Sequence, residues 1–305
     1  LCVGGGIADE ARGVDLLTGR WARAHGMPDM PVDAILLGTV AMACQEATAS
    51  ASVKAALVAA AGTADWVYAG QAAGGVTSGK SQLNADIHYL DTAAARCGRL
   101  LDQVAGDAEA VAARRDEIIA ALALTAKPYF GDVAAMSWAE VLERMVALMA
   151  FGKHGRYEDG PWPDRSYRER VAEVLWRAEA RLAGSADGTE PTGATGSSLS
   201  VLADLDGLDA PQAVLAAFLA HYPQARTVRP MATDASWFVR SVCARPGKPV
   251  CFIPVLDGDV RRWFKSDSLW QAQDARYTAD QVLVLPGPAA LAGITRADEP
   301  VAELL

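Results

Sequence analysis

Residues 30–50, MPVDAILLGTVAMACQEATAS, contain the pattern from which we interpret the rest of the chain. The apolar run at 33–37 predicts a short buried strand, and Gly38-Thr39 predicts a turn into a helix rich in small residues. The first N–H groups of such a helix and the positive end of its dipole favour an anion. Glycine lets the backbone approach a phosphate closely, and threonine adds a hydroxyl donor.

Residues 1–7, LCVGGGI, repeat this arrangement of a strand followed by a glycine turn. Two such turns on neighbouring parallel strands are typical of the last two strands of a TIM barrel, whose loops commonly share one phosphate site. The alternative interpretation is a pair of ordinary tight turns. We predict one phosphate site formed by Gly4, Gly5, Gly6, Gly38 and Thr39.

Composition excludes several classes of protein. A net charge of −9 without a basic stripe argues against a nucleic-acid partner. No apolar run is long enough to span a membrane, and no signal peptide is visible. The five cysteines are scattered and lack zinc-ligand spacing, which indicates reduced thiols, a cytoplasmic location and no metal site. The chain starts without Met on a buried-looking strand, so we expect a piece of a longer polypeptide.

The chain divides by composition into four parts. Residues 1–62 have α/β character, and 63–183 are helical after a glycine-rich loop at 63–82. Residues 184–200 are typical of a flexible linker, and 201–305 combine helices with strands. The predicted fold is an α/β barrel fragment, then a mainly α-helical domain, then a short strand-containing C-terminal segment.

Apolar periodicity and capping residues predict the individual elements. A capping box, Ser137-x-x-Glu140, marks one helix start. The predicted helices cover residues 9–17, 52–61, 86–104, 107–122, 138–151, 165–182, 211–222 and 233–243. Beyond the two barrel strands, the predicted strands cover residues 248–257 and 281–287.

Residues 74–81, GGVTSGKS, fit the phosphate-loop pattern G-x-x-x-x-G-K-S formally. That motif needs a hydrophobic strand directly before it and a continuous helix after it. The preceding YAGQAA is a poor strand, and no hydrophobic strand ending in Asp follows. We therefore interpret Lys80 as part of a solvated loop rather than as a nucleotide ligand.

Six segments together resemble one known family. They are CVGGGI, PVDAILLGTVAMACQEAT, SVKAALV, GGVTSGKSQLNADIH, RCGRLLDQVAGDAEAVAARRDEIIAALALTAKPYFGDV and KPVCFIPVLDGDVRRWFKSDSLWQ. In this order they resemble the type I fatty acid synthases of actinobacteria and, more distantly, the fungal β subunit. The resemblance covers nearly the whole chain.

This resemblance implies a place within a multifunctional enzyme. Residues 1–62 are similar to the C-terminal end of the enoyl reductase barrel, which binds FMN and uses NADPH. The helical part is similar to the region that leads to the dehydratase. The implied partners are an acyl carrier protein, other synthase domains and an enoyl-thioester substrate, in a large homo-oligomer.

The resemblance also implies roles for individual residues. The family's flavin phosphate site maps onto the two glycine turns, and Ser81 and His88 lie in SQLNADIH, which resembles a family segment close to the flavin or substrate. For His88 we favour a capping or packing role. The family's reductase histidine lies upstream of residue 1, so we assign no catalytic residue and expect this chain alone to be catalytically incomplete. A non-catalytic connector and an unrelated FMN-dependent oxidoreductase remain open.

Overall fold

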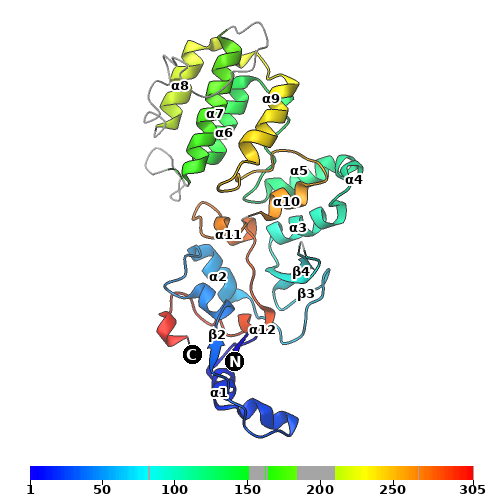
Figure 1. Cartoon of the computed structure of the whole chain (residues 1–305), viewed down its shortest axis with the longest axis vertical. Coiled ribbons are helices and arrows are strands. Elements are labelled where there is room, and N and C mark those ends of the chain that lie inside the picture. Colours follow the sequence, from blue (N-terminus) through cyan, green and yellow to red (C-terminus); the bar gives the residue numbers. More distant parts are fainter. Residues whose placement is uncertain (82, 151–161, 163, 184–209, 267, 305) are drawn as a thin grey trace. The chain divides into compact units, whose positions relative to one another are not determined.

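The computed structural model describes residues 1–304 except 82, 151–161, 163, 184–209 and 267. The chain forms two compact units (Figure 1). Unit 1 consists of Leu1–Ala105, Ala120–Ala126 and Ser268–Leu305, and unit 2 consists of Gly106–Ile119 and Lys127–Asp267. The expected boundary at residue 62 therefore falls inside unit 1. The predicted linker at 184–200 lies outside the described residues.

Unit 1 combines two small sheets with short helices. Its elements are β1 (Cys2–Gly4), α1 (Glu10–Thr18), the 3-10 helix η1 (Arg20–His25), β2 (Ala34–Leu36), the 3-10 helix η2 (Thr39–Ala43), α2 (Ala51–Ala59), β3 (Ala72–Ala73), β4 (Val76–Lys80), β5 (Asp86–Leu90), α3 (Ala93–Val104), α11 (Ser268–Gln271), η7 (Ala279–Gln281), α12 (Pro288–Leu291) and η8 (Val301–Glu303).

The two predicted N-terminal strands pair in parallel, with Val3 opposite Ile35. Parallel neighbours need a crossover, and α1 supplies it. The side chain of Asp9 caps α1, which confirms the predicted helix at 9–17. Ile7, Leu16 and Val32 form the small core beside this pair. The described sheets are both open, so the complete barrel stays a prediction.

The second sheet is antiparallel, in the order β3-β4-β5, and it corrects two predictions. Residues 72–80 were expected in a loop, and 86–104 in one helix. The spacing of Ile87 and Leu90 fits a helix, but backbone pairing of β5 with β4 overrides it. The helix α3 starts only after Thr92, whose side chain accepts a hydrogen bond from the Ala95 N–H at 3.1 Å.

The C-terminal segment from Ser268 onwards is integral to unit 1, where α12 packs against η2. The Ser50 N–H donates to Ala272 O at 2.9 Å, and the Leu90 N–H donates to Val284 O at 3.0 Å. Residues 281–287 do not form the predicted strand. The main core of the unit includes Leu57, Val76, Leu90, Val282, Val284 and Leu291.

Unit 2 is mainly helical. Its elements are α4 (Ala108–Ala113), the 3-10 helix η3 (Val133–Ala135), α6 (Trp138–Met149), α7 (Arg165–Leu182), α8 (Pro211–His221), the 3-10 helix η5 (Pro223–Arg226), α9 (Ala232–Trp237), the π-helix η6 (Phe238–Cys243) and α10 (Val260–Lys265), while α5 (Arg115–Ala123) has residues in both units. The capping box at Ser137 and the helix at 165–182 are confirmed.

Two predictions for unit 2 are wrong. The helix expected at 107–122 is broken at Arg114, which ends α4 with φ −108° and ψ 20°. The strand expected at 248–257 does not form, and Ile253 makes only an isolated parallel bridge with Tyr129. Pro249 and Pro254 lack the N–H groups that a continuous ladder needs.

Candidate functional site

The carboxyl ends of β1 and β2 lie side by side and bring the two predicted turns together. Gly4 is in register with Leu36, and a Cβ atom at Gly4 would lie 3.1 Å from Leu36 Cβ. The chain then turns through Gly5 (φ 91°) and Gly6 (φ 66°), where the left-handed conformation favours glycine. The neighbouring strands predicted from the sequence are thus present, but they are not buried as expected, since Leu36 is 65% exposed.

The second turn differs from the predicted helix start. Gly38 precedes η2, a 3-10 helix of five residues, instead of an α-helix. So short an element has a small dipole, and any anion here would depend on the turns themselves. A Cβ atom at Gly5 or Gly38 would meet no described atom within 4 Å, so both turns border open space.

Two carboxylate side chains of the protein itself already lie at the start of α1. Asp9 Oδ1 accepts the Arg12 N–H at 2.8 Å, and Glu10 adds a second carboxylate to the first turn. Two carboxylates offset the positive end of this helix dipole. The candidate phosphate site is therefore the space next to the turns, not the start of α1.

Sequence reasoning missed the C-terminal contribution to this site. The Gly287 N–H donates to Thr39 Oγ1 at 2.7 Å. A Cβ atom at Gly6 would lie 3.8 Å from Ala289 Cβ, so the same segment also reaches the first turn. Gly287-Pro288 is a helix-start pattern, but nothing in the sequence indicates that it pairs with Thr39.

The structure places Ser81 and His88 in the β4–β5 hairpin. Ser81 Oγ accepts the Ala85 N–H at 3.2 Å and so helps to close the turn. His88 is buried, with Nε2 2.8 Å from Val67 O and its ring centroid 4.7 Å from that of Trp66. Among the described residues, no hydrogen bond joins Ser81 to the glycine turns. The packing role that we favoured for His88 agrees with this geometry, although His88 lies on a strand.

The phosphate-loop interpretation of residues 74–81 does not fit the structure. Gly79 and Lys80 belong to β4, and Lys80 Nζ pairs with Asp86 Oδ1 at 2.7 Å. Hydrogen bonds from Lys80 and Trp66 lower the pKa of Asp86. A paired lysine in a strand cannot form the loop that cradles a nucleotide phosphate.

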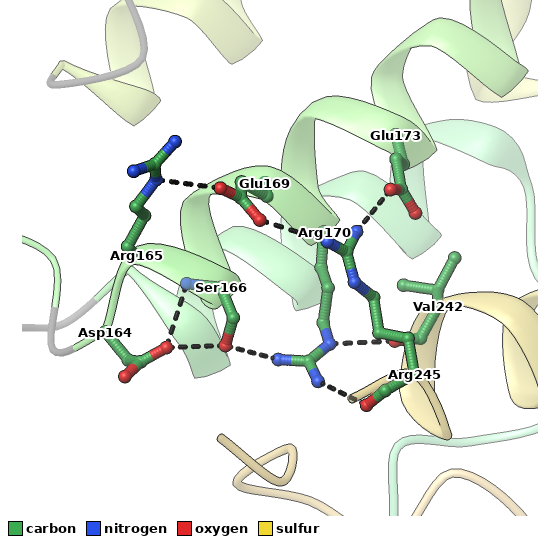
Figure 2. A network of polar contacts seen from close by, with 8 residues as sticks. All are labelled: Asp164, Arg165, Ser166, Glu169, Arg170, Glu173, Val242 and Arg245. Carbon is green, nitrogen blue, oxygen red and sulfur yellow. Dashed lines mark hydrogen bonds and ion pairs between the residues drawn. The ribbon is translucent and has the colours of Figure 1, made fainter. Parts of the chain in front are cut away.

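Unit 2 contains a second cluster of polar side chains, centred on the buried Arg170 (Figure 2). Its guanidinium donates to Val242 O at 2.8 Å, to Ser166 Oγ at 2.7 Å and to Arg245 O at 3.2 Å. Burial lowers the pKa of Arg170, and the nearby Arg245 adds to this effect. Arg245 itself pairs with Glu169 and Glu173. These contacts hold α7 against η6 and the chain after it, which is a structural role.

The described residues contain neither a cluster of metal-ligand side chains nor a helix that could span a membrane. No group of three or more His, Cys, Asp or Glu side chains there is arranged to hold a metal ion. All five cysteines are free thiols, as the sequence predicted. No helix in the described part of the chain is long and apolar enough to cross a membrane.

Comparison with known proteins identifies the family. The family described as "Fatty acid synthase subunit beta/Fas1-like, helical" matches residues 1–305. The chain belongs to this family. The fatty acid synthase subunit beta of Gibberella zeae is 35% identical over 328 residues, which cover 100% of this chain and 15% of the relative. That of Aspergillus oryzae is 33% identical with the same coverage.

A less similar relative matches over nearly the same extent of the chain. The fatty acid synthase subunit beta of Saccharomyces cerevisiae is 29% identical over 324 residues, covering 99% of this chain and 15% of the relative. The chain thus spans about 15% of the length of these relatives. The resemblance to the fungal β subunit is confirmed, whereas those to actinobacterial synthases and to the enoyl reductase barrel stay predictions.

Proposed function

We propose that this chain supplies the FMN phosphate-binding end of an NADPH-dependent enoyl-[acyl-carrier-protein] reductase within a fatty acid synthase. The observation that carries the proposal is the parallel pair β1–β2, whose carboxyl ends lead into two glycine turns next to open space. Ligands of parallel α/β structures bind at the carboxyl ends of the strands.

The residues present fit a phosphate monoester. Open space at Gly5 and Gly38 leaves room where any side chain would intrude. The Thr39 hydroxyl can donate to a phosphate oxygen while it accepts from Gly287. We assign FMN phosphate binding to Gly4, Gly5, Gly6, Gly38 and Thr39, and we keep Ser81, in the β4–β5 hairpin, as a further candidate on the family resemblance alone.

When bound, FMN supplies hydride transfer between NADPH and the enoyl thioester. The role of this chain is to anchor the phosphate of FMN and thereby to fix the position of the cofactor. No residue here is assigned to proton transfer. In the proposed assembly the acyl carrier protein, the other synthase domains and further copies of the chain complete the enzyme, in the cytoplasm.

The second candidate function is a structural connector, which the contacts of unit 2 favour. Its buried charges bind one another or backbone carbonyls, as Arg170 does with Val242 O. Such contacts brace helices. Unit 2 can therefore be a connector while unit 1 anchors the flavin, and the two functions are compatible.

Comparison of FMN with riboflavin, which lacks the phosphate, tests the proposal. Each is titrated by fluorescence into the purified chain and into a flavin-free full-length synthase carrying this segment. We expect the synthase to bind FMN more tightly than riboflavin. Equal affinities would refute a phosphate anchor, and failure of the synthase to bind either would refute the reductase assignment. A second measurement follows reoxidation of the bound flavin after NADPH has reduced it. If reoxidation requires an enoyl thioester, the enzyme is the proposed reductase and not an unrelated FMN oxidoreductase.

A further inference from the structure

Thr39 is held by a residue 248 positions further along the chain. The Gly287 N–H donates to Thr39 Oγ1 at 2.7 Å. A hydroxyl has one hydrogen to donate and two lone pairs to accept, so this contact uses a lone pair. Within the described residues, the Thr39 hydroxyl donates to no other group. Its hydrogen is therefore available, and it cannot point back toward the Gly287 donor.

Close packing fixes the position of Gly287. A Cβ atom at Gly293 would overlap the Ala8 carbonyl oxygen, so the two backbones are in direct contact. The Thr63 N–H donates to Pro288 O at 3.0 Å. Residues 287–293 are thus held both by the chain after the first turn and by the chain after α2. A donor fixed on both sides can define the orientation of the hydroxyl that it contacts.

We propose that Gly287 is a positioning residue for the phosphate of FMN. By donating its N–H to Thr39 Oγ1, it directs the Thr39 O–H toward the open space between the two turns. The proposal rests on the proposed flavin function and adds to it the C-terminal segment as part of the anchor. It predicts that the backbone N–H of residue 287, rather than the shape of its side chain, determines the preference for FMN over riboflavin.

A pair of variants at Gly287 tests this N–H group. Gly287→Ala and Gly287→Pro both add a Cβ atom 3.1 Å from Thr39 Oγ1, but only proline lacks the N–H. The φ of Gly287 is −76°, which both residues adopt without strain. Proline also places its Cδ atom where the N–H pointed, so the variants of Thr39 described below are needed to separate the lost hydrogen bond from a clash with Oγ1.

The test measures FMN and riboflavin dissociation constants of the flavin-free full-length synthase carrying each variant. We expect Gly287→Pro to weaken FMN binding about tenfold relative to Gly287→Ala, the size of one hydrogen bond to a charged group, and to leave riboflavin binding unchanged. Equal FMN affinities of the two variants would overturn the positioning role. If the unmodified synthase already fails to prefer FMN, the proposed function itself fails.

Thr39 provides the same test from the other side of the bond. Pro286 and Pro288 have no N–H, so hydrogen exchange in residues 286–288 reports Gly287 alone. We expect Thr39→Val to speed this exchange and to lower the preference for FMN, and Thr39→Ser to preserve both. If Gly287→Pro does not fold, Thr39→Val and Thr39→Ser test the positioning role instead. Exchange that is unchanged in Thr39→Val would overturn the proposal.

Discussion

Asp234 Oδ1 lies 2.7 Å from the Nε of Arg177, and both side chains are buried. Arg181 makes a second contact with the same oxygen, at 2.9 Å. One carboxylate therefore contacts two guanidinium groups between α7 and α9. Because removing one partner of a buried pair leaves uncompensated charge, this site is a sensitive point for the stability of unit 2.

We expect Asp234→Ala to lower the free energy of unfolding of unit 2 by about 3–5 kcal/mol. Urea unfolding of the chain measures this loss. The control is Glu143→Ala, which removes an exposed pair with Arg226 at 3.6 Å and should cost at most about 1 kcal/mol. Similar losses in the two variants would contradict the buried-pair interpretation.

The same carboxylate makes unit 2 sensitive to acid. Burial alone would raise the pKa of Asp234, but hydrogen bonds from Arg181, Arg177 and the Met231 N–H outweigh it, and the pKa is lowered. A lowered pKa contributes stability above the unfolded value of about 3.9, and this contribution is lost as the pH falls through the folded value. We expect unfolding free energies measured from about pH 6 to pH 3 to fall below about pH 4 in the unmodified chain. A curve of the same shape in Asp234→Ala would assign the loss to other groups.

Helix α6 depends on its capping box. Ser137 Oγ accepts the Glu140 N–H at 3.2 Å, and Glu140 Oε2 accepts the Ser137 N–H at 2.6 Å. We expect Ser137→Ala to destabilise unit 2 by about 1 kcal/mol, measured by urea unfolding. Ser236→Ala, at an exposed position inside α9, should change it by less than about 0.5 kcal/mol. A larger effect at Ser236 would count against the capping argument.

The proposed phosphate site predicts a selective effect at Gly38. Its φ of −109° is negative and an added Cβ atom meets open space, so we expect Gly38→Ala to fold. The new methyl group would intrude where the phosphate is proposed to lie. We expect FMN affinity to fall at least about tenfold, the size of one lost hydrogen bond to a charged group, while riboflavin affinity is retained. Unchanged FMN affinity in Gly38→Ala would show that the phosphate does not bind next to this turn.

Thiol labelling should distinguish Cys2 from the other cysteines. Cys2 is exposed, whereas Cys44, Cys97, Cys243 and Cys251 are buried. Burial raises the pKa of Cys97 to about 12 and also raises that of Cys243, so little reactive thiolate forms there at neutral pH. Mass spectrometry after brief alkylation of the folded chain should find Cys2 modified first. Equal labelling of Cys97 would show that α3 opens readily.

Elements with strong local patterns were predictable from the sequence. The helix at 165–182 has a sustained apolar stripe, and the capping box at Ser137 carries its own hydrogen bonds. The strands leading to Gly4 and Gly38 were also predictable, because each is an apolar run ending at glycine. In these cases the residues that decide the structure are neighbours in the sequence.

The missed features depend on contacts between distant residues. β5 satisfies a helical spacing, and only its pairing with β4 makes it a strand. The contact of Gly287 with Thr39 likewise cannot be predicted from the sequence of either segment alone. Propensity is a weak guide where tertiary pairing supplies the hydrogen bonds, and the candidate site was incomplete for the same reason.

The inclusion of residues from Ser268 onwards in unit 1 has a consequence for biosynthesis. Thr39 leaves the ribosome 248 residues before Gly287, an interval of about 12–50 s at typical rates of translation. All of unit 2 is made within that interval. Unit 2 can therefore finish folding first, although the part of unit 1 that contains Thr39 is made before it. Until Val284 and Leu291 arrive, the nascent chain exposes part of the core around Leu57, which makes it a client for chaperones.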